Sequence, residues 1–435
     1  MRKRIYLCLA HMSEAGLEQK YIKEAFDTNW VVPLGPNVNG FEADLKAFVD
    51  SLPDGGKFVE EHEVVALSSG TAAVHLALLN CGVGPGDEVL VQSFTFCASS
   101  HPITYLGAKP VFVDSEMDSW NMDPELLEKA ILDRIAVTGK KPKAIVPVAL
   151  YGMPYQVDKI MASSEKYGIP VVEDAAEGFG SRFDGQVLGT FGKYGVLSFN
   201  GNKMITTSGG GALITENQDE WREIMMYATQ YREAYPYYQH EKIGYNYRMS
   251  NICAGIGRGQ MTVANEHIAH HKHVKELYKE LFASVPGIEV HDNPSPRYDS
   301  NFWLNAITID PALRVRGQEN AYKTVVKGAV GGAAGVVHAS ESAHTDCEPN
   351  ANVEALRVLL DEAGVEARPL WKPMHRQPVY KDAVAYLSPC SLFGKEEPSV
   401  SEALFKVGMC LPSGPYVTDE DVRYIVETIK SAIVK

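Results

Sequence analysis

The sequence predicts an α/β protein with a large domain on a mostly parallel sheet and a smaller α+β domain after it. Short apolar runs alternate with helical patterns between about residues 60 and 175, which is typical of βαβ units. The run Ile145-Val146-Pro147-Val148 is apolar on both faces, as buried parallel strands are. The length of 435 residues is enough for two or three domains of ordinary size.

The expected elements of the large domain follow one another at short intervals. Residues 64–67 are predicted to form a buried strand, and Ser69-Gly70-Thr71 begins an Ala- and Leu-rich helix that runs through Leu79. Further strands are expected at residues 88–92, 110–113, 144–150, 170–173 and 196–199. Helices are expected before Tyr105 and at residues 125–135 and 156–167. The turn at residues 82–86 does not match G-x-G-x-x-G, which argues against a nicotinamide dehydrogenase.

The pattern changes in the last third of the chain. Residues 252–282 contain few helix breakers and are predicted to form one long helix that leads out of the large domain. We therefore expect a large domain at residues 1–260, whose N-terminal segment is a candidate to pack on the small domain, and a small domain at residues 261–435. Residues 317–350 are Gly-rich and lack periodicity, so a surface insertion is favoured over a functional lid.

Composition excludes several classes of protein. The chain carries 41 Lys and Arg against 55 Asp and Glu, a net charge of −14, which argues against a sequence-independent nucleic-acid binder. Its seven cysteines are scattered without a C-x-x-C pair, so neither a disulfide framework nor a structural metal site is expected. No apolar run approaches the roughly 20 residues of a membrane span, and the apolar residues 5–10 are too few for a signal peptide. A cytoplasmic protein is expected.

Three short segments carry groups that together suggest a cofactor site. Lys203 lies between a strand end and a Gly-rich turn, where ligands approach α/β sheets and where an amine can form a Schiff base. Asp174 follows a buried strand and could face a pyridinium nitrogen. The helix after Ser69 offers N-terminal amides to a phosphate. Each feature alone has an ordinary explanation: Lys203 as a surface lysine, Asp174 as an acid at a strand end, and Ser69 as a helix N-cap. Together they are the parts of a pyridoxal-phosphate site.

An ordered set of motifs makes this interpretation more specific. The motifs occupy residues 29–36 with Phe41-Glu42, then 69–73, 93–96, 173–176, 198–203, 244–248 and 368–375. In this order, and over nearly the whole chain, they resemble the DegT/DnrJ/StrS family of nucleotide-sugar aminotransferases. The resemblance implies a three-layer fold-type I pyridoxal-phosphate transferase domain. Within the family, Ser198 to Lys203 and the Asn29-Trp30 start look like transaminases that make UDP-N-acetylbacillosamine-type sugars.

The resemblance implies roles around the cofactor, pyridoxal 5'-phosphate. Lys203 would bond to the cofactor and move the proton, and Asp174 would pair with the pyridine nitrogen. Phe96 would stack on the ring, although an ordinary core position is the alternative. Glu177 stands near the ring hydroxyl, where relatives often carry Gln or His. The phosphate would be held by Gly70, Thr71 and Ser198.

The resemblance also implies a substrate site and a homodimer with shared active sites. Asn246 would reach the phosphate of the partner subunit's cofactor, although a local turn residue is the alternative. Trp30, Lys372 and His375 would line the sugar-nucleotide site.

The implied reaction moves an amino group from L-glutamate, through pyridoxamine phosphate, to a UDP-4-keto-6-deoxy-N-acetylhexosamine in surface-glycan or amino-sugar biosynthesis. Two alternatives stay open. One is a sugar dehydratase of the same family, against which Lys203 argues, since such members carry His there. The other is a non-catalytic binding protein or regulator, which would need neither Lys203 nor Asp174.

The histidines at positions 267, 270, 271 and 273 could suggest a metal, but a solvated helix face is favoured and no metal is expected.

Overall fold

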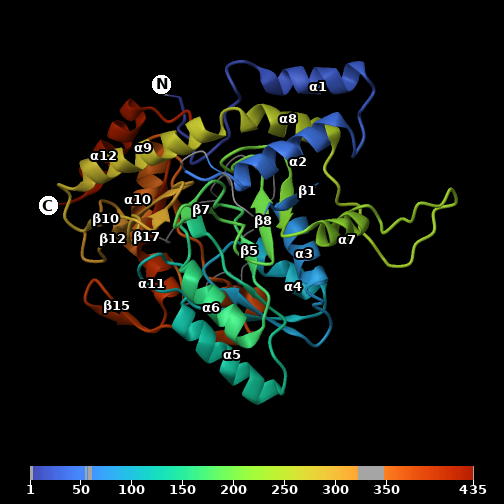
Figure 1. The fold of residues 1–435 in the computed structure, drawn as a ribbon. Helices are drawn as coiled ribbons and strands as arrows, with labels where there is room; N and C mark the ends of the chain where they lie inside the picture. The colour runs from blue at the N-terminus through green and yellow to red at the C-terminus, as the bar shows by residue number, and fades with distance from the viewer. Residues whose placement is uncertain (1–2, 54–55, 57–60, 322–346, 435) are drawn as a thin grey trace.

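The computed structural model describes residues 3–53, 56, 61–321 and 347–434 (Figure 1). Most of the predicted insertion at 317–350 lies outside these residues, so its role stays untested. Within the described chain, no helix is long and apolar enough to span a bilayer. All seven cysteines are free thiols.

A mostly parallel sheet forms the centre of the large part of the molecule, which confirms the predicted fold class. The strands follow the order β1-β9-β8-β5 and β4-β2-β3-β14, and bridges from Ile145 to Val171 and from Val148 to Asp174 join the two sets. Among the described strands of this sheet, only β9 runs antiparallel to its neighbours. The strands are β1 (Glu63–Leu67), β2 (Glu88–Gln92), β3 (Lys109–Val113), β4 (Ala144–Val146), β5 (Val172–Asp174), β8 (Tyr194–Ser198), β9 (Gly211–Thr215) and β14 (Ala385–Tyr386).

Helices cover both faces of this sheet, because successive side chains of each strand point to opposite sides. Val64 and Ala66 face a core that includes side chains of α2, α5 and α6, whereas Val65 and Leu67 face a core with α3 and α7 (Figure 1). The helices are α1 (Leu17–Asp27), α2 (Pro36–Val49), α3 (Gly70–Asn80), α4 (His101–Tyr105), α5 (Pro124–Thr138), α6 (Val157–Tyr167), α7 (Gln218–Ala228) and α8 (Asn251–Met261). The strand expected at 144–150 stops at Val146, since Pro147 has no amide hydrogen for the ladder.

A second, antiparallel sheet with its own hydrophobic core lies in the C-terminal part. Its strand order is β10-β12-β17-β13, and Ile5 of the N-terminal segment joins its core and bridges to Val365. The strands are β10 (Ile288–Val290), β12 (Asn305–Ile309), β13 (Arg368–Pro369) and β17 (Gly408–Leu411). The helices are α9 (Ala264–Phe282), α10 (Ala351–Glu362), α11 (Val400–Val407) and α12 (Asp419–Ala432). Small sheets are formed by β6 (Arg182–Phe183), β7 (Gln186–Val187) and β11 (Tyr298–Asp299), and by β15 (Cys390–Leu392) and β16 (Lys395–Glu397).

The single long helix predicted at 252–282 is wrong, because the chain forms α8 and α9 with a break at Thr262 and Val263. The Thr262 hydroxyl and amide both donate to the Gly259 carbonyl, which tightens the end of α8. We propose that the boundary between the two domains lies at this break.

The solvated histidine face predicted on α9 is also wrong for two of its members. His267 and His271 are buried, and a ring nitrogen of each lies near a backbone carbonyl, that of Met204 and of Phe302. Burial lowers the pKa of His271 to about 3, so the folded protein holds this imidazole neutral. His273 is the exposed member and pairs with Asp419 at 2.8 Å.

His271 should therefore make the protein sensitive to acid. Its unfolded pKa is near 6.5, so stability is lost as the pH falls below that value. From pH 6.5 to 5 the loss attributable to His271 is about 2 kcal/mol. Urea unfolding at pH 7 and pH 5 should show a smaller loss for His271→Asn, which keeps a donor for the Phe302 carbonyl. The exposed control His273→Asn should behave like the unmodified protein, and equal losses in all three would contradict this assignment.

Candidate active site

The candidate site lies at one edge of the central sheet, where the parallel strands β1, β5 and β8 end. Asp174 is the last residue of β5 and Ser198 is the last residue of β8, while α3 begins three residues after the end of β1. The antiparallel strand β9 starts at the same edge with Gly211, which is paired with both Leu67 and Ser198. Strand direction alone therefore brings together segments that are more than 100 residues apart.

Lys203 occupies the irregular turn that follows β8. Its amide donates to the Asn200 carbonyl at 2.9 Å, and its amine lies 3.1 Å from Oε1 of Glu177. The amine also lies over the ring of Trp303, 4.1 Å from the centroid. The side chains of Lys203 and Glu177 are 12% and 3% exposed, so this is a nearly buried ion pair.

Glu177 is fixed from two sides. Its Oε2 accepts the Tyr151 amide at 2.7 Å, and its backbone carbonyl accepts from the Asn301 side chain at 2.8 Å. Burial raises the pKa of the Glu177 carboxyl, and the charge of Lys203 opposes this rise. If the Lys203 amine loses its charge or moves away, this carboxyl can therefore gain a proton more readily than an exposed Glu.

Asp174 presents a buried carboxylate at the end of β5. Its Oδ2 accepts from the Ser99 hydroxyl at 2.5 Å and its Oδ1 accepts the Ala176 amide at 3.1 Å. Burial raises the pKa of Asp174, whereas these two hydrogen bonds and the charge of Lys203 counteract the rise. A cation next to this carboxylate would favour its charged form further.

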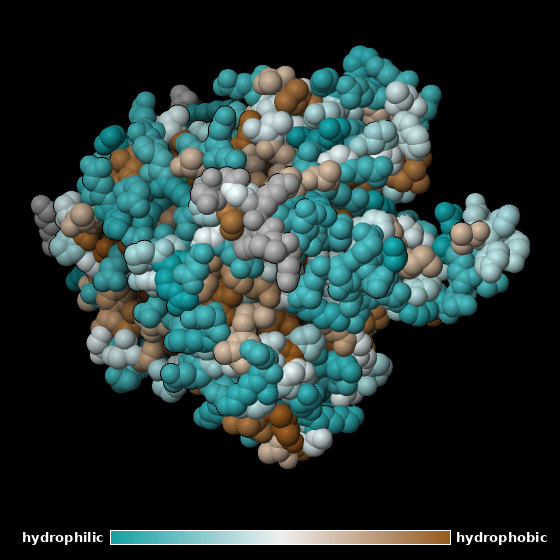
Figure 2. All heavy atoms as spheres, viewed as in Figure 1, coloured by the Kyte–Doolittle hydropathy of each residue, from teal (hydrophilic) through white to brown (hydrophobic). Residues whose placement is uncertain are grey.

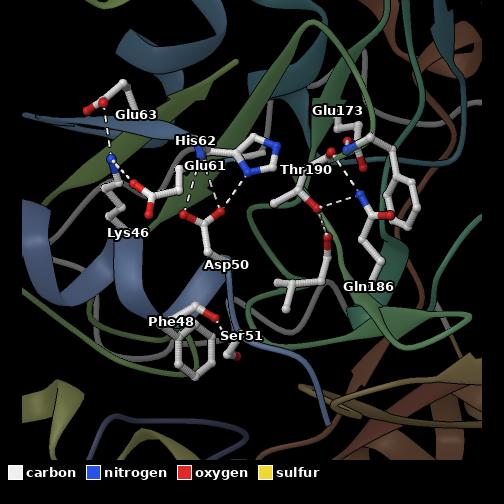
Figure 3. A network of polar contacts seen from close by, with 12 residues as sticks. Lys46, Phe48, Asp50, Ser51, Glu61, His62, Glu63, Glu173, Gln186 and Thr190 are labelled. Atoms are coloured by element: carbon white, nitrogen blue, oxygen red, sulfur yellow. Dashed lines mark hydrogen bonds and ion pairs between the residues drawn. The ribbon is translucent and has the colours of Figure 1, made fainter. Parts of the chain in front are cut away.

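Glu173, the neighbour of Asp174, points to the other side of the strand and holds the turn before β8. Its carboxylate accepts the amides of Gly189, Phe191 and Gly192 at 2.6–3.0 Å. Figure 3 shows Glu173 beside Thr190, which accepts two hydrogen bonds from the Gln186 side chain. The partly buried pair of His62 and Asp50, 2.7 Å apart, lies in the same view. The three amide contacts of Glu173 fix the turn that leads into β8, and hence the register that places Ser198.

The N-terminus of α3 forms a cradle with free donors. Ser69 caps the helix by accepting the Ala72 amide at 3.0 Å, and among the described residues the amides of Gly70 and Thr71 have no hydrogen-bond partner. A Cβ on Gly70 would lie 3.0 Å from Cβ of Ser198, and one on Gly211 would lie 2.4 Å from the Gly70 nitrogen. The backbones therefore approach closely, and only glycine leaves the helix dipole and both amides open to an anion.

An aromatic wall stands beside the Lys203 pair. The ring of Trp371 lies 5.1 Å from Tyr151, 5.5 Å from Phe96 and 6.4 Å from Trp303. Phe96 is 54% exposed, so it is not a core residue in this chain. An exposed aromatic face at the rim of a site can stack on a planar ring.

The other predicted residues differ in how far their side chains are exposed. Asn246 is exposed, in the segment that pairs with Thr229. Trp30 is 40% exposed, and its carbonyl accepts from the Asn251 side chain at 2.9 Å. Lys372 follows Trp371 and is partly buried. His375 has an imidazole that is only 6% exposed and is held between Ser93 and Glu402.

The chemistry of the donor set fits pyridoxal phosphate. The cradle at Gly70 and Thr71 suits a phosphate, the buried Asp174 suits a pyridinium nitrogen, and the Lys203 amine suits an aldehyde. Fold and site together define a fold-type I pyridoxal-phosphate enzyme.

The chain belongs to the DegT/DnrJ/EryC1/StrS aminotransferase family, whose profile matches residues 13–330 and 316–430. EpsN of Bacillus subtilis (strain 168), described as a pyridoxal phosphate-dependent aminotransferase, is 40% identical over 99% of this chain and 96% of its own. GDP-perosamine synthase of Escherichia coli O157:H7 is 31% identical over 98% of each chain. A DegT DnrJ EryC1 StrS aminotransferase from Brucella abortus superposes with a TM-score of 0.78 at 25% identity, over 97% of this chain and 96% of that one. The protein is a pyridoxal phosphate-dependent sugar aminotransferase.

Several residues of the site carry no local signal in the sequence. Trp303 and Asn301 come from the segment before β12, about 100 residues after Lys203, and Tyr151 follows β4. Ser99 lies three residues after Phe96, and its contact with Asp174 could be inferred only from the order of strands. These partners become visible only when the strands are placed side by side.

Proposed function

We propose that this enzyme transfers an amino group from L-glutamate to a keto-sugar nucleotide, a UDP-4-keto-6-deoxy-N-acetylhexosamine. The observation that carries the proposal is the buried Lys203 amine, placed between Glu177 and Trp303 at the sheet edge that also carries Asp174. The named sugar-nucleotide enzymes among the relatives support the substrate class. One of them, the UDP-2-acetamido-2-deoxy-3-oxo-D-glucuronate aminotransferase of Pseudomonas aeruginosa, is 35% identical over 60% of this chain and 68% of its own.

In this proposal each side chain has a separate task. Bound pyridoxal phosphate supplies the electron sink. Lys203 acts as general base when it takes a proton from the carbon of the amino-acid donor. It then acts as general acid when it delivers this proton to the cofactor carbon. Asp174 holds the ring nitrogen, while Glu177 neutralises the free amine of Lys203 and orients it. The Gly70 and Thr71 amides with Ser198 bind the phosphate, and Phe96 covers the ring.

The substrate site and the assembly are part of the same proposal. Trp30 and Lys372 contact the sugar nucleotide, and Lys372 supplies positive charge to an anionic substrate in a protein of net charge −14. Asn246 serves the active site of a second copy in a homodimer. The segment after α7 that leads to Asn246 protrudes from the molecule (Figures 1 and 2). Its side chains Tyr237 and Ile243 are 71% and 87% exposed, which supports a partner surface there.

A two-stage assay tests this function. The purified protein loaded with pyridoxal phosphate should lose its visible absorption when L-glutamate is added, and 2-oxoglutarate should appear in equal amount. The aminated form, freed of glutamate, should then convert one member of a panel of UDP-, GDP- and dTDP-linked keto-sugars into an amino sugar, detected by mass spectrometry.

Each alternative predicts a different result in the same assay. A dehydratase would release a deoxygenated keto-sugar without transfer of nitrogen. A non-catalytic regulator would bind cofactor or sugar nucleotide but form no 2-oxoglutarate. Reaction with another amino donor but not with glutamate would overturn the donor assignment alone.

A further inference from the structure

A chain of buried hydrogen bonds connects the central sheet to α11. Ser93 directly follows β2, and its Oγ lies 2.6 Å from Nδ1 of His375. On the other side of the ring, Nε2 of His375 lies 3.0 Å from Oε1 of Glu402 on α11. We call Ser93, His375 and Glu402 the Ser–His–Glu relay. Both ring nitrogens are engaged within the protein, so the imidazole has none left for a substrate.

The order serine, histidine, carboxylate is also that of a hydrolase triad, but the surroundings do not suit a nucleophile. Ser93 is fully buried, and its Oγ is also the acceptor of the His375 amide at 3.3 Å. Its backbone carbonyl accepts the Met374 amide at 2.8 Å. Ser93 therefore acts as a fixed anchor for the chain that runs from Trp371 to His375.

A second set of contacts fixes α11 to the neighbouring strand. Asp114 directly follows β3, and its carboxylate accepts the amides of Val400 and Ser401 at the start of α11, each at 3.1 Å. The ends of β2 and β3 are thus both tied to this helix. Glu402 is held on its other oxygen by Arg376, 3.6 Å away, so the carboxylate presented to His375 has a defined position.

The relay ends on the aromatic wall of the active site. Ser93 and Phe96 are three residues apart in one turn, and His375 and Trp371 are four residues apart in another. The rings of Phe96 and Trp371 lie 5.5 Å apart. The backbone of Trp371 is also held in place, because its amide donates to the Tyr151 hydroxyl at 2.9 Å. The two turns are joined to each other at Ser93 and His375.

We propose that His375 is a positioning residue that holds Phe96 and Trp371 against the cofactor through Ser93 and Glu402, rather than a substrate ligand. This inference rests on the proposed placement of Phe96 over the cofactor ring. It implies that Glu402, on a helix of the C-terminal part, influences the geometry of the cofactor site through His375.

The test compares variants of the Ser–His–Glu relay with a control variant that removes a different ion pair to α11. The variants are His375→Ala, Glu402→Ala and the double variant; the control is Glu397→Ala, which removes a 2.8 Å contact with Lys406 of α11. The readouts are the visible circular dichroism of bound pyridoxal phosphate, its dissociation constant, and the rates of the glutamate and sugar-nucleotide half-reactions. Urea unfolding reports whether each variant is folded.

Both single variants should reduce the cofactor's dichroism and slow both half-reactions by about 10- to 100-fold, since small displacements at a reacting centre have effects of that size. The double variant should be no worse than the single ones, because the residues act as one unit. His375→Gln, which can still donate to Glu402, should recover part of the dichroism.

Two results separate this inference from the proposed function. If the unmodified protein shows no visible dichroism with pyridoxal phosphate and no reaction with glutamate, the proposed function fails. If it reacts normally, and His375→Ala only raises KM for the sugar nucleotide while Glu402→Ala changes nothing, His375 is a substrate ligand and the positioning role is overturned. A folded Glu402→Ala variant indistinguishable from Glu397→Ala would also overturn it.

Discussion

Replacement of Lys203 by Ala should lower the rate of amino transfer by about 10³-fold or more, because it removes the amine that moves the proton. The fold should survive. Glu177 loses its partner in this variant, but burial already raises the pKa of that carboxyl, so it can take up a proton instead of remaining a buried charge. Lys203→Arg keeps a cation beside Glu177 yet should be equally inactive, which separates the charge from the chemistry of the amine.

The measurement combines kinetics with mass spectrometry. Borohydride treatment of the loaded, unmodified protein should fix the cofactor to Lys203, and the mass of Lys203→Ala should stay unchanged. Lys193→Ala is the matched control, since this lysine lies at the other end of β8 and pairs with Glu220 at 3.1 Å. Turnover of Lys203→Ala at a rate close to that of the control would refute the role of Lys203.

Replacement of Asp174 by Asn should lower kcat by about 10²–10³-fold, the size of effect seen when one preorganised electrostatic contact is lost. An Asn side chain can still accept the Ala176 amide and can meet the Ser99 hydroxyl, so the local hydrogen bonds are kept and only the charge is removed. Because burial raises the pKa of Asp174, the empty protein should not become less stable when the carboxylate becomes a neutral amide.

Three readouts distinguish this loss from general damage. Urea unfolding should give an unfolding free energy at least equal to that of the unmodified protein. The absorption spectrum of bound pyridoxal phosphate should shift, since the group facing its ring nitrogen has changed. Ser99→Ala, which removes the hydrogen bonds of this hydroxyl to Asp174 and Thr95 but leaves the charge of Asp174, should lower kcat by about 10-fold or less. An Asp174→Asn variant with full activity would mean that the carboxylate does not face the reacting ring.

Much of the large domain could be predicted because its signals are local. The strand at 88–92 and the helix after Ser69 follow from apolar runs, an N-cap and turn residues within a few positions of one another. The long helix expected at 252–282 failed for the converse reason. Residues 262 and 263 are compatible with a helix by propensity, and the packing of α8 and α9 in different parts of the fold decides that the chain breaks there.

The histidines of α9 show the same limit for single side chains. Spacing places His267 and His271 on one face, but it does not say whether that face meets water or protein. In the structure that face is buried against Met204 and Phe302, which lie on segments before and after the helix. Burial, and hence the low pKa of His271, depends on those distant neighbours.

By itself, the sequence determined the class of fold, the cofactor and the order of the motifs that identify a sugar aminotransferase, because each motif carries its own backbone requirement or reactive group. Only the tertiary structure decided which groups act on one another. The contact of Lys203 with Glu177 and Trp303, and that of Ser93 with His375 and Glu402, join segments 26 to 282 residues apart. Such pairs arise from the direction and order of strands, which bring the ends of distant segments to one edge of the sheet.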